Sequence, residues 1–263
     1  MDLELDRRTA LVLGASGGLG RAIAESLAGE GANVILGGRS AERLEPVRAA
    51  IAATAKGRVS TLVADLADPA AVDAAIADVK AGEMPDILVL NGGGPTPGAM
   101  AALDADSLVP QFRAMVEAPI RIATALLPHM RQQRFGRILV LLSSGVVQPI
   151  PNLGLSNTLR LSLVGWAKTL AAEVAADGVT VNGLIPGRIH TDRVDQLDAA
   201  AAKRTGKTPE EVAAASRATI PMGRYGAPRE FADAACFLCS GRASYITGTS
   251  LRVDGGLLRN VSS

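Results

Sequence analysis

The stretch Leu11-Val12-Leu13-Gly14-Ala15-Ser16-Gly17-Gly18-Leu19-Gly20 decides the fold class of this chain. Its apolar start is typical of a buried strand, and an amphipathic helix is expected to follow over 18–28. Gly14, Gly18 and Gly20 have the spacing Gly-x-x-x-Gly-x-Gly, which permits a tight turn and lets a pyrophosphate approach the N-terminus of the helix. An ordinary turn is the alternative. The position between the first strand and the first helix favours a dinucleotide site.

The rest of the chain alternates between short apolar runs and amphipathic stretches, and no linker, repeat or low-complexity segment interrupts it. Helical spacing is clear at 41–53 and 69–80. Such alternation predicts parallel strands joined by crossover helices that cover both faces of a sheet. We therefore expect an α/β fold in which residues 1–263 form a single Rossmann domain, a doubly wound parallel sheet of about seven strands. The expected strands are 9–13, 33–36, 59–63, 87–90, 137–142, 180–184 and 250–253.

The interval 188–221 differs from the other connections because it is polar, rich in alanine and divided by Gly206 and Pro209. It follows the expected strand 180–184. In an open α/β sheet the ligand crevice lies at the carboxyl ends of the strands. We therefore expect 188–221 to form a lid over the substrate crevice. Its sequence contains no arginine cluster that would indicate one anionic substrate.

The charge balance excludes several classes of partner. The chain has 27 basic and 26 acidic side chains and a formal charge of +1, so it lacks the long-range field that attracts nucleic acids or anionic membranes. Its longest apolar runs, such as 138–142, are far shorter than the roughly 20 residues of a membrane span. Residues 1–8 are charged rather than apolar, so we expect no signal peptide and a cytoplasmic location.

Cys236 and Cys239 form a Cys-x-x-Cys pair that permits two interpretations. A redox pair or half of a zinc site is one of them. However, no second cysteine pair exists, and His129, expected at a helix end, and His190 are distant in the sequence. Apolar residues between 230 and 240 recur at helical spacing, which favours two small core residues instead. We expect no metal.

Further motifs follow the expected strands. They are Asp65-Leu66, Asn91-Gly92-Gly93-Gly94, Pro186-Gly187 with Thr191, Arg224-Tyr225-Gly226-Ala227-Pro228-Arg229-Glu230, Tyr245-Ile246-Thr247-Gly248 and Val253-Asp254-Gly255-Gly256. With the glycine loop, these motifs make the chain resemble the short-chain dehydrogenase/reductase family over nearly its whole length. The C-terminal end is most similar to the bacterial 3-oxoacyl-carrier-protein reductases. The resemblance implies a nicotinamide dinucleotide bound by Gly14, Ser16, Gly18, Leu19, Gly20, Arg39, Asp65, Leu66, Asn91, Gly93, Arg160, Pro186, Gly187, Ile189 and Thr191.

The chain departs from the family at the catalytic set, which consists of a Ser, a Tyr, a Lys and an Asn. Alignment on 165–170 puts Ser156 at the tyrosine position and Arg160 at the lysine position. Met115 stands where the asparagine is expected. Ser143 occupies the serine position and is retained.

These replacements change the acid chemistry that the resemblance implies. In the family the lysine lowers the pKa of the phenol from about 10, so that the phenol protonates the carbonyl oxygen as hydride arrives. The hydroxyl of Ser156 is a much weaker acid, and Arg160 supplies charge but no lysine-type proton relay. Ser143 and Ser144 remain suited to hydrogen-bonding a substrate oxygen. His190 is the local candidate for a substitute acid, and the alternative is that it points into solvent.

The stretch Gly37-Gly38-Arg39-Ser40 follows the second expected strand and bears on cofactor choice. NAD would favour a carboxylate that accepts from the ribose 2′-hydroxyl, and this stretch has none. Arg39 can bind a 2′-phosphate, which predicts NADP. The alternative is an arginine in solvent, paired with Glu42 or Glu45.

Two functions of different classes fit these observations. The first, which we predict, is an NADP(H)-dependent oxidoreductase that acts on a carbonyl or hydroxyl group of a small molecule, with Ser143, Ser156 and Arg160 as the catalytic residues and an altered proton donor. The second is a catalytically inactive nucleotide-binding protein of the same fold, which acts as a sensor or partner subunit. The stretch 155–174 is apolar around much of its circumference, which together with the resemblance predicts a homotetramer, or failing that a homodimer.

Overall fold

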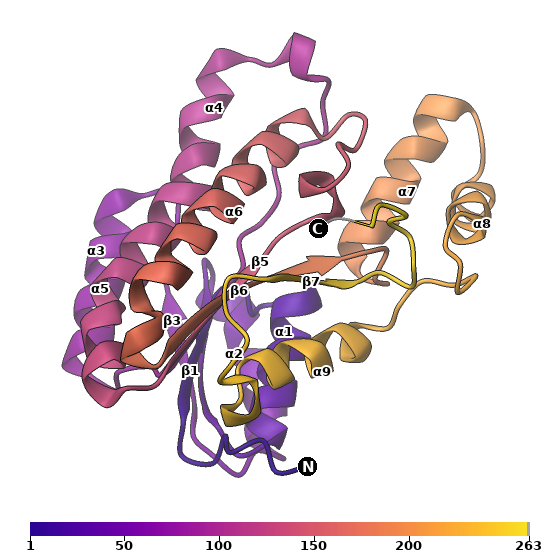
Figure 1. Cartoon of the computed structure of the whole chain (residues 1–263). Helices are drawn as coiled ribbons and strands as arrows, with labels where there is room; N and C mark the ends of the chain where they lie inside the picture. Colours follow the sequence, from indigo (N-terminus) through magenta and orange to yellow (C-terminus); the bar gives the residue numbers. More distant parts are fainter. Residues whose placement is uncertain (262–263) are drawn as a thin grey trace.

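The computed structural model describes residues 1–261, and these form one parallel sheet with helices on both faces (Figure 1). In this part of the chain the sheet has seven strands, in the order β3-β2-β1-β4-β5-β6-β7. The strands are β1 (Thr9–Val12), β2 (Asn33–Gly38), β3 (Val59–Val63), β4 (Ile87–Leu90), β5 (Gly136–Leu141), β6 (Val179–Pro186) and β7 (Ser250–Val253). The expected doubly wound α/β fold is confirmed.

Helices connect consecutive strands and cover the two faces. The α-helices are α1 (Gly18–Gly29), α2 (Ala41–Ala52), α3 (Pro69–Ala81), α4 (Ala105–Phe112), α5 (Ala118–Gln133), α6 (Gly154–Val174), α7 (Asp192–Thr205), α8 (Pro209–Ala218) and α9 (Pro228–Leu238). Shorter turns are η1 (Met100–Ala102), the π-helical η2 (Arg113–Glu117), η3 (Ser144–Val146), η4 (Ala175–Asp177) and η5 (Gly241–Ala243). Helices α1, α2 and α9 pack on one face, and α3, α5 and α6 on the other. None of the helices described in residues 1–261 is long and apolar enough to cross a membrane.

Two strands extend beyond their expected ends because a neighbouring strand pairs with the extra residues. β2 continues through Gly37 and Gly38, which pair with the end of β3. β6 continues to Pro186, opposite Val253 of β7. Glycine and proline usually mark strand ends in a sequence. Here pairing with the neighbouring strand keeps these residues in the sheet. β1 and β5 end one residue earlier than expected.

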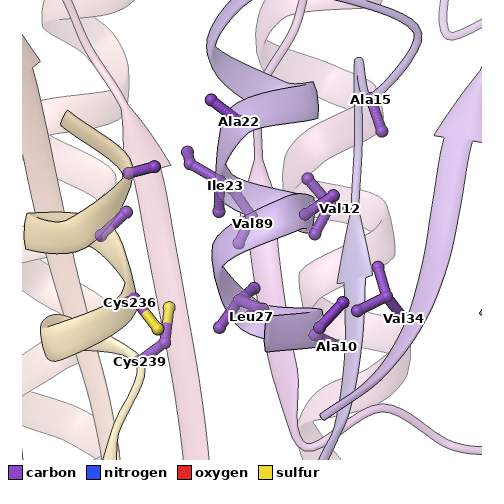
Figure 2. Packing of buried hydrophobic residues seen from close by; sticks show 14 of the residues in the cluster. Ala10, Val12, Ala15, Ala22, Ile23, Leu27, Val34, Val89, Cys236 and Cys239 are labelled. Atoms are coloured by element: carbon purple, nitrogen blue, oxygen red, sulfur yellow. The ribbon is translucent and has the colours of Figure 1, made fainter. Parts of the chain in front are cut away.

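The core between α1, α9 and the sheet accounts for the two cysteines (Figure 2). Ile23 and Leu27 of α1 are fully buried in this cluster, and Cys236 and Cys239 of α9 are buried in it as free thiols. Burial raises the pKa of Cys236 to about 11 and also raises the pKa of Cys239. Because the reactive form is the thiolate, such thiols are poor nucleophiles and metal ligands. The interpretation as small core residues is confirmed.

The lid segment, residues 188–221, leaves the sheet after β6 and forms α7 and α8, which lie apart from the two helical layers (Figure 1). Its ends are joined at the base, where the backbone N–H of Gly226 donates to the carbonyl oxygen of Arg188 at 2.9 Å. Gly206 ends α7 in the left-handed conformation, and Pro209 is the first residue of α8. The expected division at these two residues is confirmed.

Candidate active site

The glycine loop lies where the strand order reverses, because β1 pairs with both β2 and β4. Gly14 has a φ of +63°, and a Cβ there would lie 2.7 Å from Asn91 Nδ2 and 2.8 Å from the Asn91 carbonyl oxygen. Asn91 Nδ2 donates to the Gly14 carbonyl oxygen at 3.4 Å. The glycine at 14 is therefore required by close contact with the segment that follows β4, as well as by its conformation.

The N-terminus of α1 is open to an anionic ligand. Its N-cap is Gly17, which has no side chain to accept from the first N–H groups of the helix. Across from it, the methyl group of Thr191 lies 3.9 Å from the position that a Cβ on Gly18 would take. The α1 N-terminus, with Ser16 and Leu19 beside it in the sequence, thus faces the loop after β6. This arrangement fits the pyrophosphate of a dinucleotide.

At the end of β2, Arg39 is exposed and forms no ion pair with any described residue. The two glutamates that were its alternative partners are otherwise engaged. Glu42 accepts from Ser40 Oγ at 2.6 Å, and Glu45 pairs with Arg48 at 2.5 Å. Arg39 therefore lies in solvent, as the alternative expected, but it pairs with neither glutamate, and its guanidinium is available to a 2′-phosphate.

The remaining predicted cofactor residues lie along the same edge of the sheet. Asp65 and Leu66 follow β3, and Asp65 Oδ1 accepts from the backbone N–H of Ala67 at 3.0 Å. Gly93 follows β4 with open space around it. Gly187 follows Pro186 and has no room for a side chain, since a Cβ would lie 2.6 Å from Asp254 Cα.

The loop after β6 is held on both sides. Its Gly187 N–H donates to the Val253 carbonyl oxygen at 2.9 Å. Ile189 is buried and forms a bridge with Gly226, and Thr191 is the N-cap of α7. The predicted cofactor residues that follow strands therefore lie at the carboxyl ends of those strands, which share one edge of the sheet.

Ser143 follows β5 at its carboxyl end, and Ser156 and Arg160 lie on α6, from which Arg160 reaches the last residue of β5. Ser143 Oγ accepts from the Gly145 N–H at 3.1 Å. Ser156, in the first turn of α6, is 8% exposed, and its hydroxyl has no hydrogen-bond partner among residues 1–261. Arg160 lies one turn further along α6, and its Nη1 donates to the Leu141 carbonyl oxygen at 2.6 Å. The site therefore holds a free hydroxyl and a cation beside the retained serine.

The charge at Arg160 is desolvated. Burial is the main reason that the pKa of Arg160 falls to about 10, and the positive charge of Arg193 lowers it further. At neutral pH the guanidinium is still protonated. Arg160 therefore supplies a fixed positive charge inside the cleft, as the sequence predicted, and no titration near pH 7.

Met115 lies in η2, the π-helical turn between α4 and α5. It is 3% exposed and packs in the core beneath the site. π-turns are frequent at functional sites, and the residue at this one is apolar. A thioether there offers no amide to bind a water molecule.

The two histidines lie outside the catalytic cluster. His190 has a side chain that is 68% exposed, with Nε2 3.4 Å from Asp195 Oδ1. No described contact joins it to Ser143 or Ser156, which agrees with the solvent-facing alternative. His129 Nε2 lies 3.7 Å from Asp86 Oδ1, just before β4 begins, and so at the opposite edge of the sheet.

Sequence reasoning missed two groups at the site. Arg193 of α7 reaches the segment after β4, where its Nη2 donates to the Pro95 carbonyl oxygen at 3.0 Å. Asp198, buried in α7, accepts from Tyr225 Oη at 2.7 Å. Both contacts join residues far apart in the chain, so no local pattern predicts them.

Comparison with known proteins places this cleft among related enzymes. The family model described as enoyl-(acyl carrier protein) reductase matches residues 14–258. The 3-oxoacyl-[acyl-carrier-protein] reductase of Escherichia coli is 34% identical over 259 residues, which cover 97% of this chain and 99% of that protein. The corresponding reductase of Aquifex aeolicus is also 34% identical, over 98% of this chain and 100% of its own length.

Solved structures agree over the same length. YwfH, an NADPH-dependent reductase involved in bacilysin biosynthesis, superposes with a TM-score of 0.92 at 29% identity, covering 97% of this chain and 100% of that one. L-sorbose reductase from Gluconobacter frateurii, solved with NADPH and L-sorbose, superposes with a TM-score of 0.93 at 32% identity. The match covers 99% of this chain and 100% of that one. On these matches and the geometry of the cleft, the chain belongs to the short-chain dehydrogenase/reductase family of NAD(P)-dependent oxidoreductases.

Proposed function

We propose that this protein is an NADP(H)-dependent oxidoreductase that acts on a carbonyl or hydroxyl group of a small molecule and uses an altered proton donor. One observation carries the proposal. Ser143 follows β5, Arg160 of α6 reaches the last residue of β5, and the Ser156 hydroxyl on the same helix is left without a partner among the described residues. A hydroxyl that the protein itself does not satisfy is suited to a ligand.

NADP is the proposed cofactor, and the cleft fits it. The α1 N-terminus would hold the pyrophosphate, Arg39 the 2′-phosphate, and the loop of Pro186, Gly187 and Thr191 the nicotinamide end. The free Arg39 and the solved relatives with NADPH or NADP support this choice. When bound, the nicotinamide supplies or accepts a hydride.

The chain's own residues then bind and polarise the reacting oxygen. The hydroxyls of Ser143 and Ser156 donate hydrogen bonds to it, and the charge of Arg160 stabilises the negative charge that develops on it. No phenol stands ready to protonate the oxygen, so we propose that water entering the cleft delivers the proton. Stabilisation without a strong acid supports slow turnover of unactivated ketones.

A second candidate is a nucleotide-binding protein of the same fold that does not turn over. The replacement of three catalytic positions by Ser156, Arg160 and Met115 favours it. The two candidates share the cofactor cleft and differ only in whether substrate is converted.

We further propose a homotetramer in the cytoplasm. Apolar side chains are exposed on α4 and α6, where Val109 is 51%, Phe112 43% and Leu161 54% exposed. β7 is the last strand of the sheet, and its Leu251 is 39% exposed. The exposed apolar residues of α4 and α6 form one candidate contact, and the open edge of β7 with Leu251 forms a second. Association through both contacts would give a tetramer.

Binding and conversion must be measured together to test the proposal. NADPH and NADH are titrated by fluorescence, and NADPH consumption is followed with a panel of ketones, aldehydes and keto acids. We expect tight NADPH binding and slow formation of an alcohol product. NADPH binding without product from any compound would favour the second candidate, and no binding of either nucleotide would contradict both.

A further inference from the structure

Two arginines from different elements contact the segment 92–95, which follows β4. Arg160 of α6 donates through Nη2 to the Gly92 carbonyl oxygen at 3.4 Å. Arg193, in the first turn of α7, donates through Nη2 to the Pro95 carbonyl oxygen at 3.0 Å. The segment thus has one guanidinium at each end, one from the core and one from the lid segment.

Neither guanidinium is neutralised by a carboxylate. Within residues 1–261, no salt bridge includes Arg160 or Arg193. The charge that acts on Arg160 is that of Arg193, which adds to the effect of burial in lowering the pKa of Arg160 to about 10. Arg160 is part-buried and Arg193 is exposed, so the desolvated charge is that of Arg160. Desolvated charges in proteins are normally paired, and like charges in proximity are unfavourable. An anion that reaches Arg160 and Arg193 together would relieve both effects.

The acidic residues beside Arg193 do not supply that anion. Asp195 is exposed and lies 3.4 Å from the imidazole of His190. Asp192 is exposed and forms no ion pair with a described residue. The described residues beside Arg193 therefore leave the pair open to an anionic ligand.

We infer that the cleft takes a carbonyl substrate that carries a carboxylate, which Arg160 and Arg193 bind together. The inference rests on the proposed function and specifies its substrate class. Arg160 is anchored to Leu141, two residues before Ser143, so it lies on the side of the reacting oxygen. A guanidinium has five N–H donors in a planar fork, and the protein uses only two on Arg160 and one on Arg193 among the described residues.

A cavity of about 180 Å³ beside Pro95 has room for the rest of a small substrate. The loop 95–104, part of α4 and Leu155, the residue before Ser156, form its walls. Asp104 is the charged residue of these walls, and its carboxylate caps α4 by accepting from the Asp106 N–H at 3.1 Å. The cavity therefore suits a short, uncharged carbon chain next to the arginine pair.

A phosphate of the dinucleotide is the other anion within reach of such a pair. The cleft already provides for phosphates at the α1 N-terminus and at Arg39. Arg193 lies in the lid segment and contacts Pro95 instead. We therefore expect the loss of Arg193 to change the affinity for an acid substrate and not the affinity for NADPH.

The experiment compares acids with neutral esters of the same ketones. The probes are 2-oxobutanoate, acetoacetate and 4-oxopentanoate, each with its ethyl ester, titrated calorimetrically into the protein saturated with NADP⁺. The variants are Arg193→Gln and, as a matched control, Arg204→Gln, which removes an exposed arginine from the last turn of the same helix. NADPH affinity is measured for every variant, and NADPH-dependent reduction of each probe is followed in parallel.

We expect the parent protein to bind at least one acid about tenfold to a hundredfold more tightly than its ester, the range of a charge-assisted hydrogen bond. In Arg193→Gln the affinities for the acid and for its ester should differ by no more than about threefold, at unchanged NADPH affinity. Arg204→Gln should keep the parent's preference for the acid. Equal binding of acids and esters by the parent would overturn the inference. A preference for the acid that survives Arg193→Gln while the NADPH affinity falls would also overturn the inference. If NADPH does not bind at all, the proposed function fails, and the acid and ester pairs are compared on the free protein.

Discussion

Ser156 and Arg160 give the cleft a hydrogen-bond donor and a fixed charge, but no group whose proton is exchanged near neutral pH. The pKa of Arg160, about 10 after desolvation, still leaves it charged at pH 7. A protonated guanidinium stabilises an oxyanion well and gives up a proton poorly. Under the proposed function, hydride transfer is therefore supported electrostatically, and we expect the rate of protonation to depend on water.

Arg39 is the residue on which the choice of cofactor depends. Its guanidinium is unpaired among the described residues, so a 2′-phosphate can bind it without displacing a carboxylate. Arg39→Ala should weaken NADPH binding about tenfold or more and leave NADH binding nearly unchanged, because a charge-assisted hydrogen bond is worth roughly 1.5–3 kcal/mol. Fluorescence titration of both nucleotides measures this.

Lys56→Ala is the matched control for that change. Lys56 is exposed in the turn between α2 and β3, at the opposite edge of the sheet. Lys56→Ala should leave the affinities for NADPH and NADH unaltered. Equal affinities for NADPH and NADH in the parent protein would remove the basis for choosing NADP.

Among the elements, the lid segment depends on contacts at its base. Asp198 of α7 is 4% exposed and accepts from Tyr225 Oη at 2.7 Å and from Arg188 Nη1 at 3.4 Å. These residues precede, lie within and follow the two lid helices. The buried carboxylate of Asp198 therefore joins α7 to the segments at Arg188 and Tyr225, which form the base of the lid segment.

Tyr225→Phe should loosen this base. Removing the hydroxyl leaves Asp198 buried with one partner fewer, which should cost about 1–3 kcal/mol of unfolding free energy. Limited trypsin digestion at Lys203, Arg204 and Lys207 should also become faster, since the lid opens more often. Tyr245→Phe makes the same change at a fully exposed residue and should alter neither. Unchanged digestion in Tyr225→Phe would show that the lid is held elsewhere.

The elements differ in how far the sequence predicts them. Strands with continuous apolar runs, such as β4, have the expected bounds because burial on both faces leaves a clear pattern. The end of β2 was missed because Gly37 and Gly38 look like a turn until β3 pairs with them. The lid base was missed because Tyr225 and Asp198 are joined only by the fold.

At the scale of the whole molecule, the apolar surface left on α4 and α6 implies further burial. Leu161 is 54% exposed on a helix whose opposite side packs on the sheet. We expect a homotetramer by light scattering at micromolar concentration. Leu161→Glu should reduce it to smaller species, because a charge buried without a partner opposes association.

Val63→Glu is the control for assembly. Val63 is 51% exposed at the end of β3, the other edge strand, which the proposed contacts do not use. This variant should keep the parent's mass. A monomer for the parent protein would contradict the proposed assembly.

Site residues that come directly after a strand could be predicted from the sequence. Gly14, Arg39 and Asn91 could be placed from the sequence, because carboxyl ends of parallel strands share one edge. The pairing of Arg160 with Arg193 could not, because it depends on the path of the lid. That neither arginine forms a salt bridge with a described residue is a property of the packed structure alone.

The most direct test of the proposed chemistry restores the missing acid. NADPH-dependent ketone reduction is measured for the parent protein, for Ser156→Tyr with Arg160→Lys, and for that pair with Met115→Asn. We expect slow or undetectable turnover by the parent and an increase of roughly 10²- to 10⁴-fold in the double variant, the usual contribution of a general acid, with a further gain in the triple variant. Brisk parent activity that survives Ser156→Ala but is lost when His190 is changed would contradict the account, because a different acid would then be at work.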